Sequence, residues 1–191
     1  MTGDPMMGGR LDMIADGVGT PHGKPWCQDG RRTYYLMSTN GSVWSGEPGG
    51  GISMISDGKI EERLQDVNLD NTIVRMLWNS QQHGVHLFLT PRDSTVQGQH
   101  YFYDPRAGSW WMDVFDAKDA DDNYYMNPRA VHNYDGDDPN DRAILMGGFD
   151  GHLRKWSLTA ADDDGVAIDS YVYLGPVKGG IHRAVRLKEM R

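Results

Sequence analysis

The sequence has little cysteine, a shortage of positive charge and no long apolar run. Of its 191 residues only Cys27 is a cysteine, which excludes an internal disulfide and any metal site built from several cysteines. No run of 18 apolar residues occurs, so we expect no membrane-spanning helix. The first twenty residues lack the basic start and the apolar stretch of a signal peptide. The sequence therefore predicts a soluble protein.

Acidic residues outnumber basic ones, at 27 against 19, and the formal net charge is −8. A net acidic surface repels phosphate, which argues against sequence-independent binding of nucleic acid unless bases cluster on one face. The one stretch rich in basic residues is the C-terminal segment 178–191. We expect no nucleic-acid contact outside that segment.

Glycine and aromatic residues are plentiful, with 24 Gly, 6 Trp, 9 Tyr and 4 Phe. The aromatics are spread along the chain, which excludes disorder over its full length. Helical periodicity is weak, and the best candidate is 57–66, where Ile60 and Leu64 lie four residues apart among charges. This pattern predicts one or two helical turns on a surface loop and strands elsewhere.

The predicted strands are short and recur in three sets separated by Gly, Pro, Asn and Asp. The expected strands are 32–38, 42–45 and 51–56 in the first set, 73–79, 84–90, 99–103 and 109–115 in the second, and 129–133, 143–149, 152–158 and 168–174 in the third. Because the first blade is expected to begin near residue 24, the strand at 32 is counted as its second strand. The second strands then begin at 32, 84 and 143, a spacing of 52 and then 59 residues. Such recurrence of short strands is typical of propeller blades.

Each set also contains a polar turn with glycine followed by a tryptophan. The pairs are 40–41 with Trp44, 104–108 with Trp110, and 150–151 with Trp156. The Asn-Gly pair at 40–41 predicts a two-residue hairpin, because such a turn needs positive φ angles. We expect these three tryptophans to be structural residues, buried at equivalent places in successive blades.

These patterns predict an all-β fold that is a β-propeller or a partial propeller of about three four-stranded blades. We expect a single domain over 1–191, with blades near 24–56, 73–115 and 129–174. A four-stranded sheet cannot bury both of its faces alone, and stacking such sheets solves that problem. A β-sandwich whose hairpins happen to carry tryptophan is the alternative.

Five segments carry a resemblance to a known family: LMSTNGSVW, ISDGKIEERL, HGVHLFLT, HYFYDPRAGSWW and GGFDGHLRKWSL. Together they resemble a propeller family of bacteriophage virion proteins, including neck and tail proteins of short-tailed phages. The family's turn, strand and hairpin patterns correspond here to 40–44, 55–61, 86–90 and 103–110. The resemblance runs from about Trp26 to Pro176 and concerns structural positions. Kelch and sialidase-type repeats share parts of it.

The resemblance implies a non-enzymatic structural protein of a phage neck or tail that presents propeller faces to neighbouring subunits. The expected location is the virion, and the expected partners are further copies of the chain or other virion proteins. Complete propellers have about four to eight blades, and this chain holds about three. We expect segments 8–17 and 179–191 to be strands left over from incomplete blades, and the ring to be closed by other copies or by further chain.

Several residues could suggest a metal site, but none forms a complete set. His83 and His86 lie three apart on an expected strand and so point to opposite faces. His100, His132, His152 and His182 are isolated. Asp119, Asp121 and Asn123 begin like a calcium loop, but Tyr124 and Ala130 stand where glycine and glutamate are needed. The acidic loop 135–141 also lacks a downstream glutamate, and 162–164 predicts a hairpin tip. We expect no metal and no cofactor.

Catalytic patterns are also weak. There is no GxSxG motif, Cys27 has no evident base partner and is expected as a buried strand thiol, and the glycines at 49–51 precede a strand. A hydrolase of the sialidase type would need an arginine cluster that the sequence does not group. On a strand, only one of Trp110 and Trp111 can face outward and stack on a sugar. We therefore expect no enzyme, with a glycan-binding propeller as the alternative function.

Overall fold

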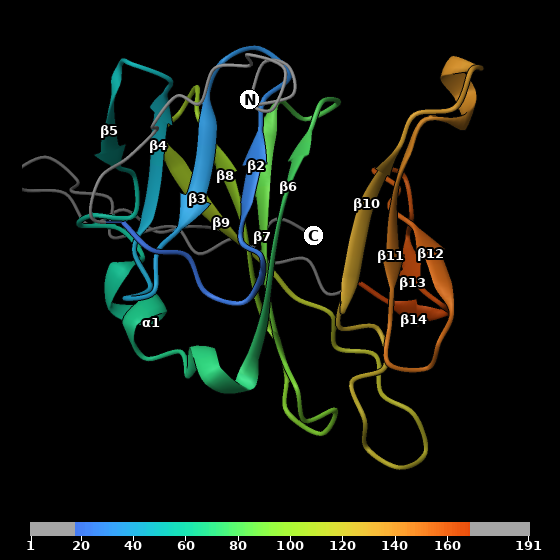
Figure 1. Cartoon of the computed structure of the whole chain (residues 1–191). Coiled ribbons are helices and arrows are strands. Elements are labelled where there is room, and N and C mark those ends of the chain that lie inside the picture. The colour runs from blue at the N-terminus through green and yellow to red at the C-terminus, as the bar shows by residue number, and fades with distance from the viewer. Residues whose placement is uncertain (1–17, 169–191) are drawn as a thin grey trace, which may run out of the picture. The chain divides into compact units, whose positions relative to one another are not determined.

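The computed structural model describes residues 18–168 of the chain. Strands take 41% of these residues and helices 7%, which confirms the all-β prediction (Figure 1). Contacts divide the chain into two units, 1–160 and 161–191. The expected leftover strands 8–17 and 179–191, and most of the expected strand 168–174, lie outside the described residues.

Three antiparallel sheets, each built from strands consecutive in sequence, make up the described part of the first unit. Sheet 1 contains β2 (Trp26–Gln28), β3 (Tyr34–Met37), β4 (Val43–Glu47) and β5 (Gly51–Met54). Sheet 2 contains β6 (Thr72–Asn79), β7 (Gly84–Pro91), β8 (Gln99–Asp104) and β9 (Ser109–Asp113). Sheet 3 contains β10 (Ala130–Tyr134), β11 (Ala143–Gly147) and β12 (Leu153–Lys155).

The remaining elements are short. Strand β1 (Gly23–Lys24) pairs in parallel with β6 and adds a fifth strand to sheet 2. Helix α1 (Glu61–Gln65) confirms the expected helical turns, and two 3₁₀ turns follow at η2 (Leu69–Asn71) and η3 (Pro139–Asp141). In the second unit, β13 (Asp162–Asp163) and β14 (Val166–Ala167) form a hairpin with its turn at 164–165, so of the expected tip 162–164 only Asp164 lies in the turn.

The turn between β3 and β4 shows why this sequence folds back at Asn40. The Ser38 N–H donates to Ser42 O at 2.8 Å, so the loop holds three residues and the expected two-residue hairpin is wrong. Gly41 has φ of 87°. A Cβ there would also lie 2.7 Å from the carbonyl oxygen of Leu64, next to α1. Glycine is therefore required both for the turn and for the close approach of the helix.

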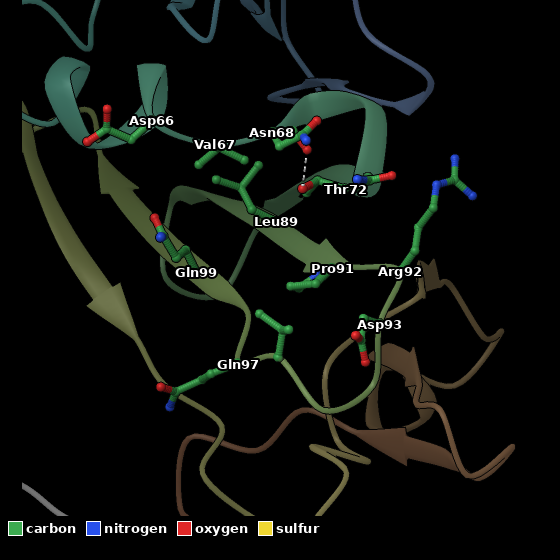
Figure 2. A pocket seen from close by; sticks show the side chains of 12 residues that line it. Asp66, Val67, Asn68, Thr72, Leu89, Pro91, Arg92, Asp93, Gln97 and Gln99 are labelled. Atoms are coloured by element: carbon green, nitrogen blue, oxygen red, sulfur yellow. Dashed lines mark hydrogen bonds between the residues drawn. The ribbon is translucent and has the colours of Figure 1, made fainter.

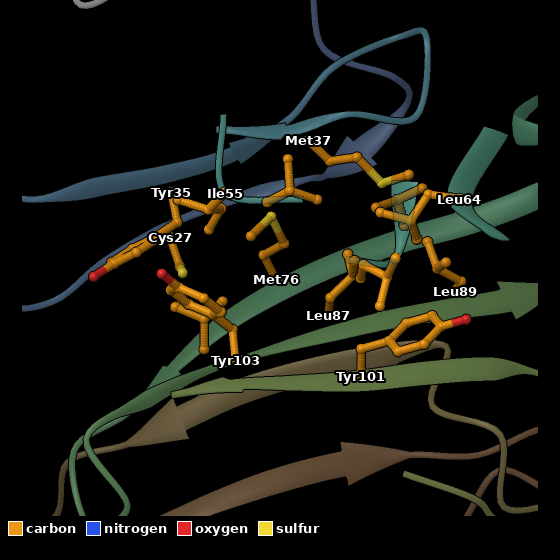
Figure 3. Packing of buried hydrophobic residues seen from close by; sticks show 14 residues of the cluster. Cys27, Tyr35, Met37, Ile55, Leu64, Met76, Leu87, Leu89, Tyr101 and Tyr103 are labelled. Atoms are coloured by element: carbon orange, nitrogen blue, oxygen red, sulfur yellow. The ribbon is translucent and has the colours of Figure 1, made fainter. Parts of the chain in front are cut away.

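Sheets 1 and 2 pack face to face through an apolar core (Figure 3). Alternate residues of sheet 1 point into it, including Tyr35 and Met37 on β3. From sheet 2, the alternate residues Val85, Leu87 and Leu89 of β7 point into the same core, and they are at most 1% exposed. Burying such side chains is worth about 1.5–3 kcal/mol each, so this interface contributes much of the stability.

Sheets 2 and 3 pack through a second cluster that uses the opposite face of sheet 2. Its buried apolar residues are Leu77, Phe88, Phe115, Ala117, Met126, Ile144 and Met146. Hydrogen bonds also cross this interface. The hydroxyl of Thr90 donates to Pro128 O at 2.6 Å, and the Asn133 amide donates to Trp78 O at 3.0 Å. Sheet 2 is thus covered on both faces.

Sheets 1 and 3 lie within 24–56 and 129–174, β6 to β9 run from Thr72 to Asp113, and β1 joins sheet 2 from outside the expected range 73–115. The second strands of the three sets begin at Tyr34, Gly84 and Ala143. Within residues 18–168, no sheet closes on itself, and sheets 1 and 3 each pack against sheet 2 through one face. Sheet 3 has three strands here. The described chain is a stack of small antiparallel sheets, and a complete ring is not part of it.

The neighbouring tryptophans of β9 provide a matched test of this packing. Trp110 packs on the first core and donates its indole N–H to Ile55 O at 3.0 Å, whereas Trp111 is 62% exposed. We expect Trp110→Ala to lower the free energy of unfolding by about 3 kcal/mol, and Trp111→Ala to change it by less than about 0.5 kcal/mol. Chemical denaturation of the two variants measures the difference. Equal effects would contradict the packing of sheet 1 on sheet 2.

Candidate functional site

The three expected blade tryptophans do not occupy equivalent places. Trp44 lies on the third strand of sheet 1, Trp110 on the fourth strand of sheet 2, and Trp156 directly after the third strand of sheet 3. All three are partly rather than fully buried. The turn before Trp110 joins the third and fourth strands of sheet 2, whereas the turn before Trp44 joins the second and third strands of sheet 1. The two turns have similar composition but are not at equivalent places. The expectation of equivalent, buried tryptophans is therefore wrong.

Trp110 and Trp156 nonetheless pack at the two interfaces between sheets. The Trp110 ring lies 4.8 Å from that of Tyr103, in the first core. The Trp156 ring meets that of His86 edge-on at 4.7 Å, in the second. Trp44 belongs to neither cluster and faces away from sheet 2.

A polar cluster lies buried at the interface of sheets 2 and 3. His86 on β7 is 1% exposed, and its Nδ1 lies 3.2 Å from the Asp113 carboxylate on β9. Its Nε2 lies 3.2 Å from the Asn79 amide nitrogen. The His86 ring stacks on Phe88, with 5.5 Å between centroids and 8° between planes. The aromatic rings and the two polar partners hold this histidine in one orientation.

His100 on β8 is the second histidine of this cluster and is fully buried. Its Nε2 lies 3.1 Å from Asn127 Oδ1, and the Asn127 amide nitrogen donates to Val96 O, which makes Nε2 the protonated nitrogen. The buried Nδ1 has no hydrogen-bond partner among the described residues. Burial lowers the pKa of His100 to about 4, because a second proton would place an unpaired charge in the interior.

This cluster can fix geometry but lacks the parts of a catalytic site. A histidine–carboxylate pair activates a nucleophile only when a hydroxyl or thiol lies within hydrogen-bond reach. His86 Nε2 is instead paired with Asn79. No group of three or more His, Cys, Asp or Glu side chains within residues 18–168 could hold a metal ion. The cluster ties the strands of sheet 2 to each other and to the loop at Asn127, and Trp156 packs on its His86 ring.

Other sequence candidates take structural places. In the loop that begins like a calcium site, the Asp119 carboxylate accepts the backbone N–H groups of Asp121 and Asn123, both at 2.9 Å. These bonds lower the pKa of Asp119. Cys27 is buried on β2 as expected, and burial raises the pKa of its thiol. His83 is exposed in the turn before β7, and His182 lies outside the described residues.

A pocket of about 550 Å³ opens between the α1–β6 connection and the end of β7 (Figure 2). Several of its polar side chains are engaged with neighbouring groups. Asn68 Oδ1 accepts from Asp70 N, the Thr72 hydroxyl donates to Asn68 O, and Gln97 donates to Asp116. Two hydrogen bonds from Thr95 lower the pKa of Asp93. No aromatic side chain lines the pocket, which argues against a sugar-stacking site.

The outward face of sheet 1 is the most unusual surface of the described chain. Register places two rows of side chains on it: Trp26, Leu36, Trp44 and Met54, then Gln28, Tyr34, Gly46 and Ile52. None of these eight positions carries a charge. Trp26 is 47% exposed, and the apolar residues on β3, β4 and β5 are partly exposed. We call this surface the sheet 1 outer face.

Sequence reasoning did not find this face or the polar cluster. The signal for the face was available, because YYLM and VWS are apolar at successive positions rather than at alternate ones, which is typical of strands covered on both faces. His86, His100 and Asp113 lie on three neighbouring strands, so only the strand register brings them together.

Comparison with known proteins adds no relative. No family model, no curated protein and no solved structure matches the chain. No helix within residues 18–168 is long and apolar enough to cross a membrane. Functional inference therefore depends on the surfaces and clusters described above.

The depressed pKa of His100 predicts a loss of stability in mild acid. The unfolded histidine binds a proton near pH 6.5, and the folded one binds it near pH 4. The contribution of neutral His100 is therefore complete above pH 6.5 and is lost as the pH falls toward 4, by about 3 kcal/mol. Denaturation at pH 7 and at pH 4.5 measures this loss. His100→Gln should reduce the difference between the two pH values, and an equally steep loss in that variant would contradict the assignment.

Proposed function

We propose that this protein is a non-enzymatic interaction module that binds a neighbouring protein surface through its sheet 1 outer face. The observation that carries the proposal is the lack of charge on that face, together with its six large apolar side chains. Trp26 is exposed and the other five apolar side chains are partly exposed, and large apolar patches on soluble proteins mark interaction sites. Tryptophan and tyrosine are also the residues most enriched where interfaces concentrate their binding energy.

The composition of the face favours a protein partner. Its opposite face already packs on another β-sheet through Tyr35, Met37 and Val43. Six of the eight outer positions match such an interior face in size and polarity. Stacked sheets lie about 10 Å apart and interdigitate their side chains, and a second sheet is the partner that this surface fits.

We place the module in a phage particle, as a neck or tail component. The support is the resemblance of the segments from Trp26 to Pro176 to virion propellers, and a virion supplies many repeated protein surfaces. Mass spectrometry of purified particles tests the location, with peptides of this chain as the expected finding. Their absence from intact particles would overturn the virion assignment and leave the interaction function standing.

Hydroxyl-radical footprinting tests the interaction function, because it oxidises exposed tryptophan and methionine. We expect oxidation of Trp26 and Met54 to fall when the protein associates at high concentration or is assembled in particles. Trp111, exposed on sheet 2, is the internal control and should remain reactive. If Trp26 and Met54 stay as reactive as in dilute protein under both conditions, the proposed function is wrong.

A glycan-binding function is the second candidate, and one observation favours it. Trp111 is 62% exposed on β9, and an exposed indole can stack on a sugar ring. Under this alternative, a glycan array shows binding that Trp111→Ala abolishes without loss of stability. No binding by the unmodified protein would eliminate the alternative, and turnover of a bound glycan would contradict the non-enzymatic function.

A further inference from the structure

The sheet stack ends in two different open faces. Sheet 1 packs on the sheet that follows it in the chain, and sheet 3 packs on the sheet that precedes it. Within residues 18–168, sheet 1 therefore has no preceding neighbour and sheet 3 has no following one. A second copy of the same chain has both missing parts.

The outward face of sheet 3 can be identified from register. Val131, Ile144 and Met146 point toward sheet 2. The opposite positions are Ala130, His132, Tyr134, Ala143, Leu145, Gly147, Leu153 and Lys155. Tyr134 is 49% and Leu153 is 68% exposed. We call this surface the sheet 3 outer face.

The three sheets also have the same orientation in the stack, and this orientation determines which outer faces can pack together. In a strand of L-residues with a given direction, the face on which a side chain lies determines whether that residue's N–H and C=O groups bond to the left or to the right neighbouring strand. Met37 faces sheet 2 and donates its N–H to Pro25, on the first-strand side of sheet 1. Arg92 continues the alternate residues that face sheet 3 and donates to Asn71, again on the first-strand side.

Sheet 3 repeats this orientation. Ile144 faces sheet 2 and accepts a hydrogen bond from Trp156, on the β12 side, so the outward residues of β11 bond toward β10. On the sheet 3 outer face, as on the faces by which sheets 1 and 2 contact the next sheet, the second-strand residues bond toward the first strand. On the sheet 1 outer face, as on the faces by which sheets 2 and 3 contact the preceding sheet, the second-strand residues bond toward the third strand. Continuing the stack places these two faces together.

We propose that two copies of this chain join head to tail, with the sheet 1 outer face of each packed on the sheet 3 outer face of the other. This proposal rests on the proposed function and names its partner. The arrangement has a two-fold axis and contains two such interfaces. It makes a ring of six sheets, which lies within the four to eight blades of complete propellers.

The chemistry of the two faces is complementary. The sheet 1 outer face offers the aromatic rings of Tyr34 and Trp44, and the Trp26 ring at its edge already has the Lys24 ammonium 5.7 Å from its centroid. The sheet 3 outer face carries apolar side chains and the single ammonium of Lys155. An ammonium over an aromatic ring is attractive, and more so when water is excluded. No acidic residue lies on either face, so Lys155 meets no competing carboxylate there.

Two charge insertions and their mixture test the proposal. Leu36→Glu lies at the centre of the sheet 1 outer face, and Leu145→Glu lies at the centre of the sheet 3 outer face. Light scattering should give the mass of two chains for the unmodified protein and of one chain for each variant. The control Ser53→Glu is at an exposed position of β5 that faces away from the proposed interface, and it should remain dimeric.

The mixture identifies the head-to-tail geometry. Each variant alone has a damaged face at both interfaces. An equal mixture of the two can form one interface from two undamaged faces, so we expect it to regain the two-chain mass, more weakly than the unmodified protein. If instead the sheet 1 outer faces of two copies bound each other, mixing would not restore the association of Leu36→Glu. Circular dichroism should show that both variants remain folded.

The remaining outcomes separate this proposal from the proposed function. If Leu36→Glu abolishes association and Leu145→Glu does not, the interaction function holds and the head-to-tail copy is wrong. If neither variant changes the mass of a dimeric protein, binding through these faces is wrong. An unmodified protein that is monomeric when concentrated, or that forms more than two chains per particle, overturns the two-copy ring.

Discussion

The structure depends on sheet 2 being buried on both faces. Strand β7 shows this most directly, because its residues from Gly84 to Thr90 are all buried. Its alternate side chains enter two different cores, with Leu87 on one side and Phe88 on the other. A strand of this kind cannot exist at the surface of a two-layer fold. The two flanking sheets are therefore a condition for sheet 2 to form.

The two interfaces of sheet 2 differ in character and therefore in what they contribute. The first is apolar and supplies mainly hydrophobic stabilisation. The second contains the buried His86, paired with the partly exposed Asp113, and the amides of Asn79 and Asn127. Removing either partner of such a bond would leave a buried polar atom without hydrogen bonds, which costs about 1–3 kcal/mol. The bonds from the Asn133 amide to Trp78 O and from the Thr90 hydroxyl to Pro128 O also cross this interface, so they restrict how sheet 3 can sit on sheet 2.

Local patterns in the sequence predict the elements better than their assembly. Gly41 marks the turn before β4, Ile60 and Leu64 mark the helical turn, and the alternation at Trp110 and Trp111 predicts one inward and one outward ring. Each of these depends on residues close in sequence. The expected two-residue loop at Asn40 is wrong, because of the two residues only Gly41 adopts a positive φ.

Long-range features were beyond sequence reasoning for a physical reason. Trp44 and Trp110 follow similar turns, and only strand order shows that they belong to different hairpins of their sheets. His86, His100 and Asp113 are isolated in sequence and become neighbours through the registers of β7, β8 and β9. A shift of one residue in either register would move a histidine to the opposite core. Composition carries no information on that choice.

The same constraint connects the fold with the proposed assembly. The face-to-face burial that stabilises sheet 2 on both sides is available to sheets 1 and 3 on one side each within the described chain. Strands β3 and β4 nevertheless carry apolar side chains toward both faces, as β7 does. A sequence under pressure only for the stability of an isolated stack would gain solubility from charge at Leu36 or Trp44 at little cost in packing. The apolar residues at these positions are the basis for proposing that another protein surface covers sheet 1.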